Sequence, residues 1–597
     1  MAERNVLGER ISGGAWREMV DAARWRAEIV AGRLTRRDLL KAGLLTASGC
    51  LVAKRGLSTR WQSLVMPTAQ AASPSVTPFV DPLPIMPIKT PVPTLTPEPA
   101  LVPNLAAGEA RTRPHQAFVQ FPPAELYSVV QRQAAVKLSP SLPAQQMWGF
   151  DGIVPGPTYV ARYGRPILIR NFNQLPLGNG GFGINSVSTH LHNGHTPSES
   201  DGFPCDFFDS SRWYDQHYPN VLAGILSTHP GTGDINEALS TLWYHDHRID
   251  FTAQNTYKGL VGFYLLFNEF DTGDEATGFR LPRFPEFDIP MMFADKVFDP
   301  LDGTLAFDLF SLDGVLGDTF TVNGKVQPFL EVAPRRYRLR WLNVGPSRFY
   351  ELFLTDPSDT SVPNAFWQIA ADGNLLPQPL QVTSVRLSPA ERADVIVDFR
   401  QFAGKSIYIE NRLLQTSGRG PSDTVLAPGQ GNRLLRVDVV LPPVADDSRD
   451  PATVSRFYAM PSVDAAPAVT RNFQFSRTNG QWTLNNRFMD CSGVRFSVAQ
   501  NSAEVWQLNG TSNWQHPMHV HMEEHQILAR GGLAPPPHER GRKDVTRLQV
   551  VERVDVFMRF RDWTGRYVVH CHNLVHEDHA MMCRFDVDPR GDTNATP

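Results

Sequence analysis

Four His-x-His triplets constrain the fold of this chain more than any other feature of its sequence. Random placement of 17 histidines in 597 residues would give about half of one such triplet. Residues i and i+2 of a β-strand face the same side, so each triplet can aim two imidazoles at one point. Four such pairs predict eight nitrogens around one metal cluster, so segments far apart in the chain must meet. The triplets are His190-Leu191-His192, His245-Asp246-His247, His519-Val520-His521 and His570-Cys571-His572.

The last triplet predicts a second metal site, because its central residue is a cysteine that points away from its two neighbours. His576 follows Cys571 by five residues, and Met581 follows after five more. A thiolate, imidazoles and a thioether at this spacing match a blue-copper centre, which uses two His, one Cys and a weak axial Met. The second histidine is His516, which opens the run 516–521. Zinc sites normally show closely spaced cysteine pairs, and this sequence has none.

Together these motifs resemble the complete copper signature of the multicopper oxidases. The resemblance extends from about residue 113 to residue 588 and includes Trp243-Tyr244-His245-Asp246-His247 and His516-Pro517-Met518-His519-Val520-His521. The stretches 196–202 and 322–326 are more similar to the spore-coat laccase, bilirubin oxidase and phenoxazinone synthase branch than to fungal laccases. The resemblance implies an all-β fold of three cupredoxin-like Greek-key domains, with a trinuclear copper cluster between the first and third.

The resemblance also implies four copper ions and a ligand for each. The type 1 copper would take His516, Cys571, His576 and Met581, and the type 2 copper would take His190 and His519. The paired type 3 coppers would take His192, His245, His247, His521, His570 and His572. The other seven histidines are expected at surface, loop or core positions. His195 and His579 lie close to ligands, and the alternative for these two is a role in orienting them.

Two acids are candidates for the protons that oxygen reduction consumes. Glu577 follows His576, and Asp201 lies nine residues after His192. Both positions resemble the proton-relay acids of the spore-coat laccase branch. The alternative for each is an ordinary surface carboxylate.

Outside the motifs, the sequence has an all-β pattern. Short runs of Val, Ile, Leu, Phe and Tyr alternate with Gly, Pro, Asn and Asp, as in repeated sandwich or barrel domains. Polar, turn-like stretches at 269–287 and 442–455 divide the chain. We therefore predict domains at 113–270, 285–442 and 455–590.

The N-terminal region predicts export. Thr35-Arg36-Arg37-Asp38-Leu39-Leu40-Lys41 resembles a twin-arginine motif, and an apolar run follows it, so 1–71 is interpreted as a signal region. Cleavage after Ala71 and lipidation at Cys50 are both open. Residues 72–112, rich in Pro, Thr and Ala, predict a disordered linker. The expected location is periplasmic, cell-surface or extracellular.

The remaining composition excludes some partners. The net charge of −4 and the lack of a basic tract do not indicate nucleic-acid binding, and no apolar run is long enough to span a bilayer. We expect a monomer. In an oxidising compartment Cys205 and Cys491 could form a disulfide and leave Cys583 free, although spacing does not settle the pairing.

The predicted activity is laccase-like: one-electron oxidation of phenols, aminophenols or bilirubin-like pigments, coupled to reduction of O2 to water. A metal ion, Mn(II) or Cu(I), is the alternative reductant, and the 14 scattered methionines form no insert of the kind associated with Cu(I) oxidation. The alternative functions are those of a non-enzymatic cupredoxin scaffold, a copper nitrite reductase and a copper-sequestering protein. The intact ligand set argues against the first, and the His-Cys-His bridge argues against the second.

Overall fold

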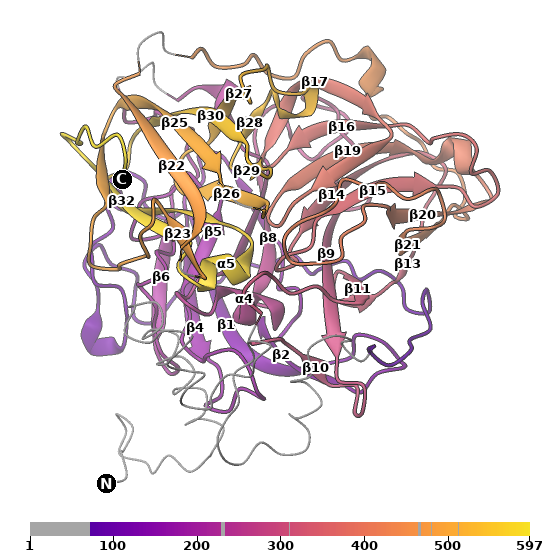
Figure 1. Cartoon of the computed structure of the whole chain (residues 1–597), viewed down its shortest axis with the longest axis horizontal. Helices are drawn as coiled ribbons and strands as arrows, with labels where there is room; N and C mark the ends of the chain where they lie inside the picture. The colour runs from indigo at the N-terminus through magenta and orange to yellow at the C-terminus, as the bar shows by residue number, and fades with distance from the viewer. Residues whose placement is uncertain (1–71, 228–232, 310, 464–466, 479, 512) are drawn as a thin grey trace.

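The computed structural model describes residues 72–597 except 228–232, 310, 464–466, 479 and 512. These residues form six β-sheets, paired into three β-sandwiches (Figure 1). Helices are short: α4 (Thr252–Tyr257), α5 (Leu574–Asp578) and the 3-10 turns η1 (Leu105–Ala107), η2 (Ile235–Glu237), η3 (Phe399–Phe402), η4 (Pro451–Thr453) and η5 (Pro537–Glu539). The predicted all-β fold is therefore confirmed. No helix in the described part of the chain has the length and apolarity needed to cross a membrane.

The first sandwich contains eight strands. They are β1 (Glu125–Val136), β2 (Gln145–Phe150), β3 (Tyr159–Arg162), β4 (Ile167–Gln174), β5 (Thr189–His192), β6 (Trp213–Tyr218), β7 (Thr241–Asp246) and β8 (Val261–Phe267). One sheet has the order β2-β1-β4-β6 and the other β3-β8-β7-β5. In β5 and β7 the register pairs His190 with His245, so the first two triplets lie side by side.

The second sandwich is the largest and contributes none of the predicted metal ligands. Its strands are β9 (Asp288–Phe298), β10 (Leu305–Ala306), β11 (Thr319–Val322), β12 (Lys325–Val326), β13 (Phe329–Glu331), β14 (Arg336–Asn343), β15 (Tyr350–Thr355), β16 (Phe366–Ala371), β17 (Asn374–Val382), β18 (Ser384–Leu387), β19 (Arg392–Asp398), β20 (Ser406–Asn411) and β21 (Asn432–Asp438). Its sheets have the orders β12-β11-β9-β14-β19-β16-β17, with β10 paired to β9, and β13-β21-β20-β15-β18. Strands β9 and β14 are buried along their whole length, as expected of strands covered on both faces.

The third sandwich carries the other two triplets. Its strands are β22 (Val469–Thr478), β23 (Gln481–Leu484), β24 (Phe496–Ala499), β25 (Ser502–Gly510), β26 (His516–Val520), β27 (His525–Arg530), β28 (Arg542–Lys543), β29 (Val545–Leu548), β30 (Arg553–Phe560), β31 (Gly565–Cys571) and β32 (Met582–Asp588). The sheet orders are β23-β22-β25-β30-β27-β28 and β24-β32-β31-β26-β29. The register pairs His519 of β26 with His570 of β31.

Residues 72–112 do not form the predicted disordered linker. Instead they run along the first and second sandwiches, with bridges from Pro82 to Phe329 and from Val92 to Leu126. Leu83, 6% exposed, enters the core of the second sandwich. The composition of this segment favours an extended chain without its own secondary structure, but strand edges supply partners that composition does not reveal. The predicted signal region 1–71 lies outside the described residues.

Candidate metal centres

The first centre is formed by His516, Cys571 and His576, all fully buried in the third sandwich. His516 begins β26, Cys571 ends β31, and His576 lies on α5. Cys571 Sγ lies 3.5 Å from His516 Nδ1 and 3.6 Å from His576 Nδ1, and the two Nδ1 atoms lie 3.2 Å apart. These three atoms surround one point, the donor arrangement of a trigonal His2Cys site.

Met581 lies beside this group and would supply a thioether to a metal ion held there. It is fully buried, its backbone N–H donates to the His576 carbonyl at 3.0 Å, and its own carbonyl accepts the Cys571 N–H at 3.1 Å. Trp482 stacks on the His576 ring with centroids 3.7 Å apart. Burial raises the pKa of the Cys571 thiol well above its usual value. A bound cation would compensate the thiolate there, because metal binding displaces the thiol proton.

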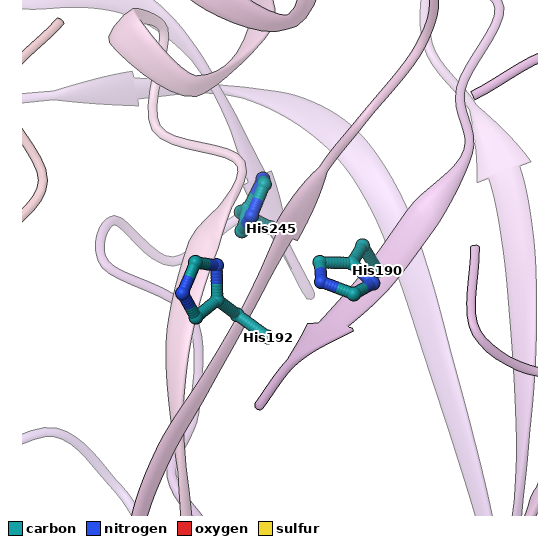
Figure 2. Close-up of side chains that lie close together, drawn as sticks. All are labelled: His190, His192 and His245. Atoms are coloured by element: carbon teal, nitrogen blue, oxygen red, sulfur yellow. The ribbon is translucent and has the colours of Figure 1, made fainter. Parts of the chain in front are cut away.

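The second centre contains all eight histidines of the four triplets, each at most 1% exposed. Figure 2 shows the rings of His190, His192 and His245 gathered between their strands; one nitrogen of each lies within 4.8 Å of the others. Rings from the first and third sandwiches interleave across the domain interface. His190 stacks on His521 and His192 on His519, both with centroids 3.8 Å apart.

In several of these histidines one ring nitrogen is hydrogen-bonded outside the cluster, so the other ring nitrogen faces into it. The Nδ1–H of His519 donates to the Asp544 carbonyl at 2.9 Å, and that of His245 donates to the Asp246 carbonyl at 2.7 Å. Their Nε2 atoms are buried without a hydrogen-bond partner, as is Nε2 of His190. A buried acceptor without a partner is costly, so such a cluster fits metal ions that the imidazoles would bind.

The protonation of these histidines also suits metal binding. Burial lowers the pKa of His245 to about 3, and it lowers the pKa of other cluster members well below the usual value. Those members are His190, His192, His519, His521 and His572. Imidazoles held neutral keep the lone pair that a metal needs.

The two predicted relay acids both touch this cluster. Asp201 Oδ2 lies 2.7 Å from His521 Nδ1, and Glu577 oxygens lie 3.0 Å from Nδ1 of both His247 and His570. Burial raises the pKa of Asp201 well above its usual value. Burial opposes ionisation of Glu577 too, but the adjacent His570 and His247 outweigh it and hold the pKa of Glu577 well below its usual value. Neither residue is a surface carboxylate.

Asp544 also belongs to this centre, although the sequence does not predict it. Its carboxylate lies 3.2 Å from His192 Nε2, and His192, His519 and Asp544 form one of the groups that could hold a metal ion. Arg392 of the second sandwich pairs with Asp544 at 2.7 Å. No local signal marks Asp544, because it follows Lys543 just before β29 in an otherwise ordinary strand sequence.

Other residues near the ligands have structural contacts. His195 pairs with Asp562 at 2.7 Å, and His579 Nδ1 donates to the Val575 carbonyl at 2.5 Å. The pairing that spacing left open is present in the structure: Cys205 and Cys491 form a disulfide between the first and third sandwiches. Cys583 is buried and free.

The donor sets of both centres suit copper. Two imidazoles, a thiolate and a nearby thioether form a soft site typical of copper that carries electrons, and the histidine cluster suits copper as well. Metal ligands from the first and third sandwiches meet between them, as the resemblance of the motifs implies.

Comparison with known proteins agrees with this chemistry. Residues 462–591 match the family profile described as multicopper oxidase. A bilirubin oxidase of Albifimbria verrucaria is 32% identical over 536 residues, covering 86% of this chain and 82% of the relative. A laccase of Bacillus subtilis (strain 168) is 30% identical over 524 residues, covering 78% and 94%.

The fold has solved counterparts. A crystal structure of a laccase from Pediococcus acidilactici Pa5930 has a TM-score of 0.67 at 21% identity and covers 87% of this chain and 96% of its own. The chain thus has the fold of a three-domain copper oxidoreductase. It belongs to the multicopper oxidase family, laccase- and bilirubin oxidase-like, whose members oxidise a reducing substrate with O2.

Proposed function

We propose that this enzyme oxidises phenolic or aminophenolic compounds one electron at a time at a type 1 copper and reduces O2 to water at a trinuclear cluster. His516, Cys571, His576 and Met581 would hold the type 1 ion. His190 and His519 would hold the type 2 ion, and His192, His245, His247, His521, His570 and His572 would hold the type 3 pair. Copper, when bound, supplies one-electron redox chemistry and a template for oxygen.

The observation that carries this proposal is the position of Cys571 between His570 and His572. The thiol of Cys571 belongs to the first centre, whereas both neighbouring imidazoles belong to the second. A few covalent bonds of the segment 570–572 therefore join the two sites. A copper store or a one-centre copper protein needs no such connection.

The surroundings of His576 favour an organic reductant over a metal ion. The Asp313 carbonyl lies 3.0 Å from His576 Nε2, which places Asp313 beside the first centre. Its carboxylate is paired with Arg477 at 2.7 Å and with Arg419 at 3.4 Å. A Mn(II) ion would have to displace these guanidinium groups and would meet their positive charge.

Oxygen uptake by the copper-loaded protein tests the function. We expect a blue absorption band, about four copper ions per chain, and uptake driven by phenols or aminophenols without accumulation of peroxide. Uptake driven only by Mn(II) or Cu(I) would support the metallo-oxidase alternative. A copper-loaded protein that consumes no oxygen with any reductant would contradict the oxidase assignment.

We also propose that the enzyme is exported by the twin-arginine pathway and acts as a monomer outside the cytoplasm. The Cys205–Cys491 disulfide supports an oxidising compartment. Replacement of Arg36 and Arg37 by Lys should retain the protein in the cytoplasm, as measured by cell fractionation. Light scattering of the purified enzyme should give the mass of one chain.

A further inference from the structure

A short segment of the second sandwich lies against the first centre. Trp482 Nε1 donates to the Leu312 carbonyl at 2.6 Å, and the Asp313 carbonyl contacts His576. Leu312 is 37% exposed, and the side chain of Asp313 is 33% exposed. The fully buried His576 is thus in direct contact with a partly exposed residue, Asp313.

Aromatic side chains connect this surface to His576. Trp514, which is half-buried, packs edge-to-face on Trp482 with centroids 5.2 Å apart and planes at 86°. Trp482 in turn stacks on His576 at 3.7 Å. A ring that docks on Trp514 therefore reaches the first centre through two close aromatic contacts, which is a short distance for electron transfer.

Two arginines frame Trp514. The guanidinium carbon of Arg419 lies 4.9 Å from the Trp514 ring centroid, and that of Arg477 lies 5.3 Å away. Both pair with Asp313, so two positive charges share one carboxylate. The Arg419 side chain is 54% exposed, and that of Arg477 is 21% exposed. This surface therefore presents a partly exposed tryptophan beside two guanidinium groups, which together carry one more positive charge than the Asp313 carboxylate they share.

We propose that Arg419, Arg477 and Trp514 form a docking face for aromatic reductants that carry an anionic group such as a carboxylate. The ring packs against Trp514, and the anion accepts hydrogen bonds from the guanidinium groups, which suit planar carboxylates. Each encounter removes one electron from a phenol; the electron enters the protein on the His576 side and the phenolic proton passes to water. The inference rests on the proposed oxidase function and specifies that the preferred substrate carries a negative charge.

The test compares two phenols that share a ring, syringate and neutral 2,6-dimethoxyphenol, in the copper-loaded enzyme. Arg419→Gln and Arg477→Gln should each lower kcat/KM for syringate about threefold relative to the neutral phenol, the size expected of an exposed charge pair. The double variant should lose about tenfold, and Arg477→Lys should keep most of the preference. Added salt should weaken the preference of the wild type and leave the double variant unchanged.

Arg400→Gln is the matched control. Its side chain is also 54% exposed and paired with an aspartate, Asp398. Arg400 lies away from the first centre, because its partner Asp398 is paired with Arg336 at the start of β14. The first centre lies beyond the other end of that strand, where Ser347 contacts Asn573. Arg400→Gln should leave both substrates unaffected.

The outcomes separate this inference from the function on which it rests. Equal losses for both phenols, or no loss, with an intact blue band would overturn the docking face while the oxidase assignment stands. If neither phenol supports turnover, quenching of tryptophan fluorescence by syringate still decides the inference. Syringate binding that the double variant loses supports the docking face, and binding that the variant keeps refutes it.

Discussion

The carboxylate of Asp372, a residue of the second sandwich, accepts the backbone N–H of Asp544 at 3.1 Å and thereby fixes a segment of the third sandwich. It also accepts the N–H of Val545 at 3.1 Å and pairs with Lys543 at 3.0 Å. The Asp544 carbonyl in turn accepts the Nδ1–H of His519. The second sandwich supplies no predicted ligand, yet it fixes the ring orientation of one through this chain of contacts.

Loss of this support should weaken copper binding at the histidine cluster. Asp372→Ala should lower copper affinity there about 10- to 100-fold, the range for groups that orient metal ligands. Copper content after dialysis against a chelator and the electron paramagnetic resonance signal of the type 2 ion measure this, while the blue band should persist. Asp372→Asn, which keeps one acceptor oxygen, should lose less. Equal copper content in all three proteins would refute the role of Asp372.

Glu577 should be needed for oxygen reduction but not for the first centre. It contacts His247 and His570 and lies next to His576 in sequence, without a contact to Cys571 Sγ among the hydrogen bonds of the described residues. Glu577→Gln keeps the size of the side chain and removes its proton-accepting charge. Turnover should fall about 100-fold or more, as expected on removal of a general acid–base group. Stopped-flow reoxidation checks this, and normal turnover at normal copper content would argue against the relay.

The His195–Asp562 pair should stabilise the junction of the first and third sandwiches in a limited pH range. Burial disfavours both charges, but Glu523 and Asp562 outweigh it and raise the pKa of His195, while His195 and backbone N–H groups lower the pKa of Asp562. The contribution of Asp562 is lost as pH falls through its lowered folded pKa. The contribution of His195 is lost as pH rises through its raised folded pKa. Both are present between about pH 4 and 6.5, the unfolded values. In this range Asp562 supplies the negative charge, because burial raises the pKa of Glu523 to about 7.

His195→Gln should therefore cost about 2 kcal/mol near pH 5 and less at alkaline pH. Urea unfolding of the variant and the wild type across pH measures the difference. A difference that does not change with pH would show that packing, and not charge, accounts for the stabilisation.

The Cys205–Cys491 disulfide should stabilise the enzyme without affecting its copper centres. It closes a loop of 286 residues in sequence separation, so its removal should cost about 2–5 kcal/mol. The double variant Cys205→Ser, Cys491→Ser should lose activity faster on heating and keep its blue band at room temperature. Thermal inactivation half-lives provide the comparison, and identical half-lives would refute a stabilising role.

Features with a local physical cause could be predicted from the sequence. The alternation of a β-strand places residues i and i+2 on one side, so the triplets alone predicted that His570 and His572 leave the strand opposite to Cys571. In the structure Cys571 Sγ contacts His516 in the first centre, whereas the rings of His570 and His572 lie near each other in the second. Strand-rich sequence between Gly and Pro turns predicted the all-β fold for the same reason.

The tertiary structure alone decided contacts between distant segments. No sequence signal marks three of these contacts, because a strand pattern does not specify which remote side chain will pack against a given residue. They are the contact of Asp544 with His192, that of Asp372 with Asp544, and those of Arg419 and Arg477 with Trp514. The same limit explains the mistaken linker at 72–112, whose partners are strand edges elsewhere in the chain. The sequence by itself determined the donor atoms and the face of the strand on which each lies. Folding decided which nitrogen faces the cluster, which acids touch it and what surrounds its entrance, since these depend on long-range packing.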